Sequence, residues 1–174
     1  MKISLRAVVF TAVAFTVSAC SHVEPLQTVD HVDIERFMGD WYVIANIPTS
    51  IEKGAHNAVE SYRLDDDGSI ATTFTFKEGG FDGELKTYEP RGFIRDDSNA
   101  VWGMQFIWPI KADYRIIYLD EAYTVTVIGR NKRDYVWIMA REPKISAQQY
   151  ADLLDMLESV GYDRASVQLV PQKW

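Results

Sequence analysis

The stretch Gly39-Asp40-Trp41-Tyr42 marks the start of the first regular strand in this chain of 174 residues. A short helical turn over residues 32–38 precedes it, and Gly39 ends that turn. Residues 40–47 then alternate with both faces partly apolar, which is typical of a strand that is covered on both sides. We therefore predict that this stretch opens a closed β-barrel.

Seven further segments of strand character follow at regular spacing. Short polar or glycine-containing turns join them, such as Asp65-Asp66-Asp67-Gly68, in which Gly68 is free to take positive φ. The eight predicted strands are residues 40–47, 58–64, 69–77, 86–95 (with a bend at Pro90 and Gly92), 100–107, 113–119, 123–129 and 135–141. An all-β, up-and-down antiparallel barrel is the predicted fold class, because closure removes exposed strand edges.

The pattern after the last barrel strand is helical. Ser146 suits an N-cap position, Gln149 completes a capping box, and Gly161 ends the helix. The apolar residues between them form one stripe: Tyr150, Leu153, Leu154, Leu157 and Val160. We expect this C-terminal helix to pack on the outside of the barrel, followed by a short final strand at residues 167–170.

The N-terminus is predicted to be a lipoprotein signal peptide over residues 1–19. Lys2 and Arg6 lead into an apolar run over residues 7–17, which is too short to span a bilayer permanently. The sequence Val17-Ser18-Ala19-Cys20 then resembles a bacterial lipobox. This resemblance implies cleavage before Cys20 and acylation of Cys20, which would anchor the protein to a membrane.

An ordinary secretory signal that happens to end near a cysteine is the alternative. Ser21, rather than an aspartate, follows the cysteine, which resembles the sorting pattern for the outer membrane. Residues 20–31 contain few large apolar residues, so we expect a lipid-anchored tether there. The folded domain is predicted to span residues 32–174.

Composition excludes several classes of function. The formal net charge is −7, so a nucleic-acid partner is not expected. Cys20 is the one cysteine, which rules out a disulfide within the chain. The three histidines, His22, His31 and His56, are scattered rather than spaced for a metal, and no glycine-rich phosphate loop occurs. We therefore predict no metal, no cofactor and no catalytic residue.

Several motifs in this order resemble the lipocalin family, and more narrowly its bacterial outer-membrane, apolipoprotein-D-like members. They are Gly39-x-Trp41-Tyr42, Tyr62-x-Leu64-x4-Ser69, Trp108-Pro109 before Asp113-Tyr114, and the run Arg133-Asp134-Tyr135-x-Trp137-Ile138-x-x-Arg141-x-Pro143-x-Ile145-Ser146. The resemblance covers about residues 30–174. It implies that Gly39, Trp41 and Arg141 form the barrel floor, with the Arg141 guanidinium stacked on the Trp41 indole.

A barrel of eight strands has room for one small ligand, and the rich aromatic content of 13% could line such a space. The candidate lining residues are Ile70, Thr72, Phe74, Phe76, Trp102, Met104, Phe106, and either Tyr114 or Arg115, depending on register. If Arg115 points inward, it could meet an anionic ligand head. The alternative is that these side chains only pack against each other.

The predicted function is that of a lipid-anchored lipocalin of the cell outer membrane, with its domain in the periplasm. It would bind a fatty acid, a lysophospholipid or a similar small apolar ligand for storage or transport, without catalysis. An isomerase-like enzyme would need titratable groups inside the cavity, and none is expected from the strands. A third alternative is an interaction module for a membrane partner, which exposure of both Phe93 and Ile107 would favour. The sequence leaves open whether the protein forms a homodimer.

Overall fold

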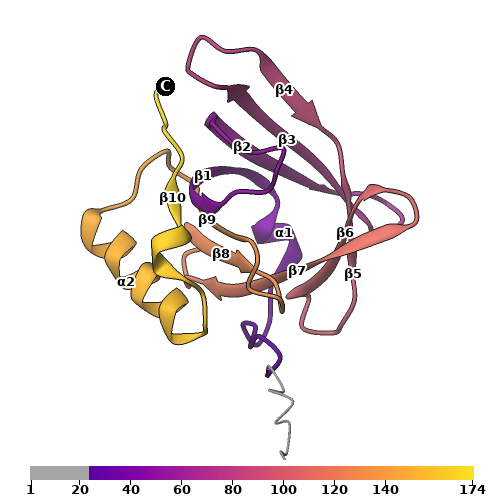
Figure 1. The fold of residues 1–174 in the computed structure, drawn as a ribbon. Helices are drawn as coiled ribbons and strands as arrows, with labels where there is room; N and C mark the ends of the chain where they lie inside the picture. Colours follow the sequence, from indigo (N-terminus) through magenta and orange to yellow (C-terminus); the bar gives the residue numbers. More distant parts are fainter. Residues whose placement is uncertain (1–23) are drawn as a thin grey trace, which may run out of the picture.

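One antiparallel sheet closes on itself in residues 24–174, the part of the chain that the computed structural model describes. Its elements are α1 (Ile34–Phe37), β1 (Gly39–Ile47), β2 (Ala55–Leu64), β3 (Ile70–Glu78), β4 (Leu85–Tyr88), β5 (Arg91–Ile94), β6 (Val101–Ile107), β7 (Ile110–Leu119), β8 (Val125–Gly129), β9 (Val136–Ala140), α2 (Ala147–Ser159), the 3-10 turn η1 (Arg164–Ser166) and β10 (Gln168–Leu169). Neighbouring strands follow the order β10-β1-β2-β3-β5-β6-β7-β8-β9, and pairing of β1 with β9 closes the barrel (Figure 1). None of the helices in this range has the length and apolar character that a membrane crossing requires.

The predicted eight-stranded barrel is confirmed, with one strand in two pieces. β4 pairs with the later part of β3, β5 pairs with its start, and the two are separated at Pro90. Proline has no N–H to donate to a ladder, but its carbonyl still accepts a hydrogen bond from the Thr72 N–H at 3.1 Å. β4 and β5 therefore act as one barrel strand with a break in the middle.

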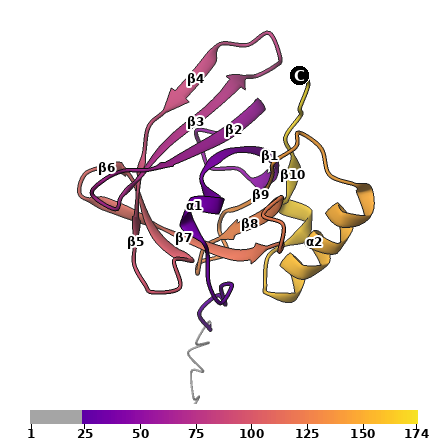
Figure 2. The same ribbon diagram turned by 180° about the vertical axis from the view of Figure 1, so that it is seen from behind.

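The C-terminal helix packs where the apolar stripe predicts. Ser146 caps it by accepting a hydrogen bond from the Gln149 N–H at 3.1 Å, and Leu153 and Leu157 are buried. Figure 2 shows α2 on the outside of the barrel. They belong to an apolar cluster with residues from the outer face of β1, β8 and β9. A first apolar cluster fills the barrel itself, so the sheet is covered on both sides over these strands.

The C-terminal tail completes the sheet where β1 and β2 separate. Their pairing ends at Tyr42 and Val59, which leaves backbone carbonyls beyond that point without a ladder partner. Gln172 fills the gap, since its Nε2 donates to the carbonyls of Val43 at 2.8 Å and Ala58 at 3.1 Å. The last residues of the chain are therefore part of the barrel wall.

The expectation of a tether that reaches residue 31 needs correction. Leu26 is only 3% exposed, and its N–H donates to Asn131 Oδ1 at 2.8 Å. The Val29 N–H donates to the Ile116 carbonyl at 3.0 Å. Residues 24–32 are thus a strap that packs on the barrel, because they carry apolar side chains and find backbone partners there. The predicted leader, Cys20 and the rest of the tether lie outside the described residues.

The barrel floor is built around Arg141. Its guanidinium carbon lies 3.8 Å from the centre of the Trp41 ring, as the resemblance implied. Its Nη atoms donate to the backbone carbonyls of Arg36, Phe37, Met38 and Asp40 over 2.7–3.0 Å. These carbonyls follow the start of α1 and have no helical partner, so the side chain of a distant strand satisfies them. α1 is thereby held across the closed end.

Gly39 occupies a position that requires glycine. Its φ is +92°, a conformation that residues with a Cβ rarely adopt. A Cβ there would also lie 3.4 Å from Arg141 Nη1. The turn at Gly39 directs the chain from α1 into β1 and brings Trp41 under the guanidinium.

Candidate ligand cavity

The barrel interior above the floor is hollow in two adjoining chambers. The inner chamber has a volume of about 50 Å³ and is lined by Glu60, Thr72, Phe74, Pro90, Met104, Phe106, Ala112, Asp113, Tyr114 and Trp137. The outer chamber, at the mouth, has a volume of about 250 Å³ and is lined by Thr49, Ser50, Ile51, Glu52, Glu60, Phe74, Phe106, Ala112, Arg130 and Trp137. Half of each lining is shared, and the two volumes together reach the low end of those typical for ligand pockets.

Five of the predicted lining residues are in the wall of the inner chamber. They come from three strands: Thr72 and Phe74 from β3, Met104 and Phe106 from β6, and Tyr114 from β7. These positions share the inward parity that the alternation of each strand predicts. Apart from the aromatic rings, the methionine thioether supplies a flexible wall.

Three predicted residues point inward but lie outside both chambers. Ile70 and Trp102 are completely buried next to the floor, where the Trp102 ring stacks on Tyr114 at 4.9 Å between centroids. Phe76 is buried between Phe74 and Tyr88, whose rings lie 5.3 and 6.2 Å away. These three side chains do point into the barrel, as the alternation along their strands predicted. Alternation does not tell how deep in the barrel a side chain lies, and these three fill the core instead.

The structure places Arg115 on the outside of the barrel, which corrects its assignment to the cavity. Its neighbour Tyr114 takes the inward position, so the next side chain on the strand must face outward. Arg115 Nε donates to Asp113 Oδ1 at 3.0 Å on that outer face. An anionic ligand head inside the barrel therefore has no contact with Arg115.

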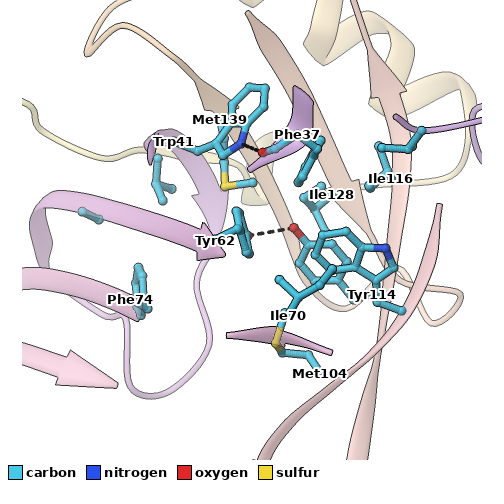
Figure 3. Packing of buried hydrophobic residues seen from close by; sticks show 14 of the residues in the cluster. Phe37, Trp41, Tyr62, Ile70, Phe74, Met104, Tyr114, Ile116, Ile128 and Met139 are labelled. Atoms are coloured by element: carbon cyan, nitrogen blue, oxygen red, sulfur yellow. Dashed lines mark hydrogen bonds between the residues drawn. The ribbon is translucent and has the colours of Figure 1, made fainter. Parts of the chain in front are cut away.

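A carboxyl group that was not among the predicted lining residues lies inside the barrel. Glu60 lies on β2 in register with Trp41 of β1 and Phe74 of β3, and it lines both chambers. Its Oε2 accepts a hydrogen bond from the Tyr62 hydroxyl, whose oxygen lies 2.8 Å from the Tyr114 hydroxyl oxygen (Figure 3). Alternation along β2 could have placed Glu60 inside the barrel, because Glu60 and Tyr62 lie two residues apart and share one face of the strand.

Burial shifts the titration of this polar chain. Desolvation raises the pKa of Glu60 to about 7, with a smaller contribution from the nearby charge of Glu52, while the hydrogen bond from Tyr62 opposes the shift. Desolvation also raises the pKa of Tyr62 and of Tyr114 well above the usual value for a phenol. The two phenols are therefore neutral in the physiological range, and Glu60 is the group of the three that changes charge there.

The mouth carries a second set of polar groups. Glu52 is 5% exposed and accepts hydrogen bonds from Trp137 Nε1 at 2.6 Å and from the N–H and hydroxyl of Thr49 at 2.8 and 2.6 Å. Arg130 lies 3.5 Å from Asp134 through Nη1, and its buried Nε has no partner within residues 24–174. Glu52 thus fixes the Trp137 indole in the wall, and Arg130 brings a positive charge to the rim.

An apolar hairpin borders the mouth. The turn between β6 and β7 is seen in Figure 1, and its residues Ile107, Trp108 and Ile110 are 69–82% exposed, with Phe106 beside them half exposed. Ile107 is thus exposed, which is one of the two exposures that would favour an interaction module. Phe93, also outward, is covered by Lys111, whose Nζ lies 3.3 Å from the ring centre.

Metal-binding chemistry has no support in the geometry of residues 24–174. No group of three or more histidine, cysteine, aspartate or glutamate side chains lies close enough there to hold an ion. The polar chain of Glu60, Tyr62 and Tyr114 contains a single carboxyl and two phenols. These three groups form hydrogen bonds to one another.

Comparison with known proteins agrees with this architecture. Residues 32–172 match the family model described as a lipocalin-like domain. The chain belongs to the lipocalin family. This lipocalin is 32% identical over 164 residues to the outer membrane lipoprotein Blc of Citrobacter freundii, covering 91% of the chain and 92% of Blc.

Two further comparisons place the lipocalin more broadly. It is 30% identical over 155 residues to apolipoprotein D of Bos taurus, covering 84% of this chain and 78% of that protein. The crystal structure of the allergen Per a 4 from cockroaches matches with a TM-score of 0.63 at 18% identity, covering 84% and 93% of the two chains. The predicted family and fold class are confirmed.

Proposed function

We propose that this lipocalin binds a small apolar molecule, such as a fatty acid or a lysophospholipid, in the two chambers of the barrel. The observation that supports this most directly is that the largely apolar side chains of Phe74, Met104, Phe106 and Trp137 line the inner chamber. Each methylene that moves from water into such a space contributes about 0.8 kcal/mol. A single acyl chain would gain enough to bind without any strong polar contact.

The proposed role is storage or transport of the ligand at the outer membrane, with the domain in the periplasm. Two observations support this location: the lipobox-like sequence ending at Cys20, and the similarity to a protein named outer membrane lipoprotein. Mass spectrometry of the N-terminal peptide tests it, since acylation adds the mass of the lipid to Cys20. An unmodified Cys20 in protein isolated from membranes would contradict the anchor.

Binding without catalysis fits the residues that line the cavity. Neither a histidine nor a cysteine is among the residues of the two described chambers, so no activated nucleophile is at hand. Glu60 is the inward titratable group that an enzyme would require, but its hydrogen-bond partner is a phenol rather than a base or a nucleophile. We therefore assign Glu60 to ligand contact.

Fluorescence titration tests the binding proposal. Residues 24–174 contain every barrel strand and both apolar clusters, so the chain without residues 1–20 keeps the whole described fold. Fatty acids and lysophospholipids should quench Trp137, which lies in the wall of both chambers, and should do so saturably. Absence of saturable binding to every lipid tried would refute the proposal.

A pair of variants locates the site. Met104→Trp fills the inner chamber, and we expect the affinity for a long-chain ligand to fall at least about tenfold. Arg115→Lys is the control, because this side chain lies on the outer face, and its affinity should equal that of the wild type. Equal binding by Met104→Trp, with the fold intact by circular dichroism, would place the ligand elsewhere.

A further inference from the structure

Glu60 occupies the junction of the two chambers. It is the one glutamate in the linings of both, and the rings of Phe74, Phe106 and Trp137 accompany it in each. A carboxyl group in such a place is costly, because transfer of its charge from water to apolar surroundings is unfavourable. A carboxyl group that makes no contact with a ligand would only lower the affinity of this cavity for apolar molecules.

The hydrogen bonds of the polar chain leave Glu60 with spare acceptor capacity. Tyr62 donates to Oε2, and Tyr114 can donate to the Tyr62 oxygen, so both phenolic protons are used within the chain. No other group within residues 24–174 donates to this carboxyl, and its Oε1 is without a hydrogen bond. Because an ionised carboxyl can accept about four, Glu60 itself offers spare acceptors at the junction of the chambers, while the unpartnered buried donor among the described residues is Arg130 Nε in the lining of the outer chamber.

The charged groups around the junction do not neutralise Glu60. Glu52, from the loop between β1 and β2, adds a negative charge and is held by Trp137. Arg130 lines the outer chamber but not the inner one. Asp113 is among the residues that line the inner chamber, but its carboxylate forms an ion pair with Arg115 on the outer face of the barrel. No ion pair to Glu60 exists within the described part of the chain.

We propose that Glu60 is a specificity-determining residue that selects ligands by the polar group they insert. It favours an amphiphile whose inserted end donates a hydrogen bond, an amine or a hydroxyl, over one that inserts a carboxylate. This inference rests on the proposed function, and it names the class of ligand that the cavity takes. Tyr62 and Tyr114 act through Glu60 as positioning residues.

The selection depends on pH. When Glu60 is ionised, an ammonium group is attracted and a carboxylate is repelled, and both effects are strong where water is scarce. When it is protonated, repulsion of the carboxylate ends and the carboxyl can itself donate to that ligand. The affinity for an amine should therefore rise with pH, and the affinity for a carboxylate should fall. Because the effect depends on the binding of a single proton to Glu60, the affinity can change by at most about tenfold for each pH unit.

Three probes of equal chain length separate these effects: dodecylamine, 1-dodecanol and dodecanoic acid, titrated by calorimetry below their aggregation thresholds at pH 5.5 and pH 8.5. For the chain without residues 1–20, we expect the amine to bind at least about tenfold more tightly at the higher pH and the acid at least about tenfold more weakly. The alcohol should change less than about threefold, because it carries no charge.

Two variants and one control complete the test. Glu60→Gln should remove the pH dependence for all three probes, and Glu60→Asp, which keeps a carboxyl, should retain its direction. Glu121→Gln, an exposed residue beyond the closed end, is the matched control and should behave as the wild type. A pH dependence that survives in Glu60→Gln would overturn the inference, as would equal, pH-independent binding of all three probes by the wild type. Failure of all three to bind at either pH would instead overturn the proposed function.

Discussion

Replacement of Arg141 by alanine should destabilise the domain strongly. Four backbone carbonyls at the floor lose a hydrogen bond from Arg141, although the Phe37 carbonyl still accepts one from Trp41 Nε1 at 2.9 Å, and the Trp41 ring loses its cation. Water can reach part of this site, so we assign about 0.5–1 kcal/mol to each lost hydrogen bond rather than the full value for a buried charged group. The lost stacking adds about 1 kcal/mol, and the total is about 3–5 kcal/mol.

Urea unfolding followed by near-ultraviolet circular dichroism measures this change, and the melting temperature should fall by roughly 10 °C. Arg141→Lys keeps the charge, but its ammonium group cannot serve four carbonyls and a ring face together, so about half of the loss should remain. Arg164→Ala is the control: its ion pair with Asp155 is exposed, and its removal should cost less than about 1 kcal/mol. A loss below 1 kcal/mol in Arg141→Ala would show that water satisfies the floor carbonyls and would refute the reasoning.

Three further predictions concern stability. The pKa of Glu60 is raised to about 7 in the folded state from an ordinary 4.5, so stability should fall by up to about 3 kcal/mol as pH rises from 4.5 through 7; urea unfolding of Glu60→Gln should lack this loss. Leu26→Ala should cost about 2–4 kcal/mol in the same assay, whereas a free tether would give no change. Gly129→Ala should lower the free energy of unfolding by about 1–3 kcal/mol, because the added Cβ would lie 2.7 Å from atoms of both Leu26 and Tyr162. The control Gly103→Ala should lower it by less than about 1 kcal/mol, because the added Cβ meets only the flexible end of an arginine side chain. Equal losses in the two variants would contradict this account.

Local sequence patterns were sufficient to predict the fold. Alternation of apolar and polar residues placed the eight strands, and glycine, aspartate and asparagine placed the turns, because these signals depend on near neighbours in the chain. The capping box at Ser146 predicted the helix for the same reason. Boundaries were less accurate: β7 begins at Ile110 rather than Asp113, since the hairpin turns tightly at Trp108 and Pro109.

The cavity was harder to predict because it depends on the depth of each side chain in a closed barrel. Trp102 and Met104 share one face of β6, yet the first lies beside the floor and the second lines the chamber. Glu60 was missed because a glutamate on a strand of mixed polarity also fits an outward position. The packing of Leu26 on the barrel depends on partners about a hundred residues away, which no local pattern shows.

The Gln172 side chain has a consequence for the order in which the barrel can be completed during folding. The hydrogen bonds donated by its side-chain amide reach back 129 residues to the Val43 carbonyl and 114 residues to the Ala58 carbonyl. Contacts over such separations in sequence slow folding, because long segments of chain must be ordered before they form. A partly folded domain in which the barrel strands are already paired still has a gap between β1 and β2. The wall can close only after Gln172 has docked, and until then the partly folded barrel exposes unpaired strand edges to other chains.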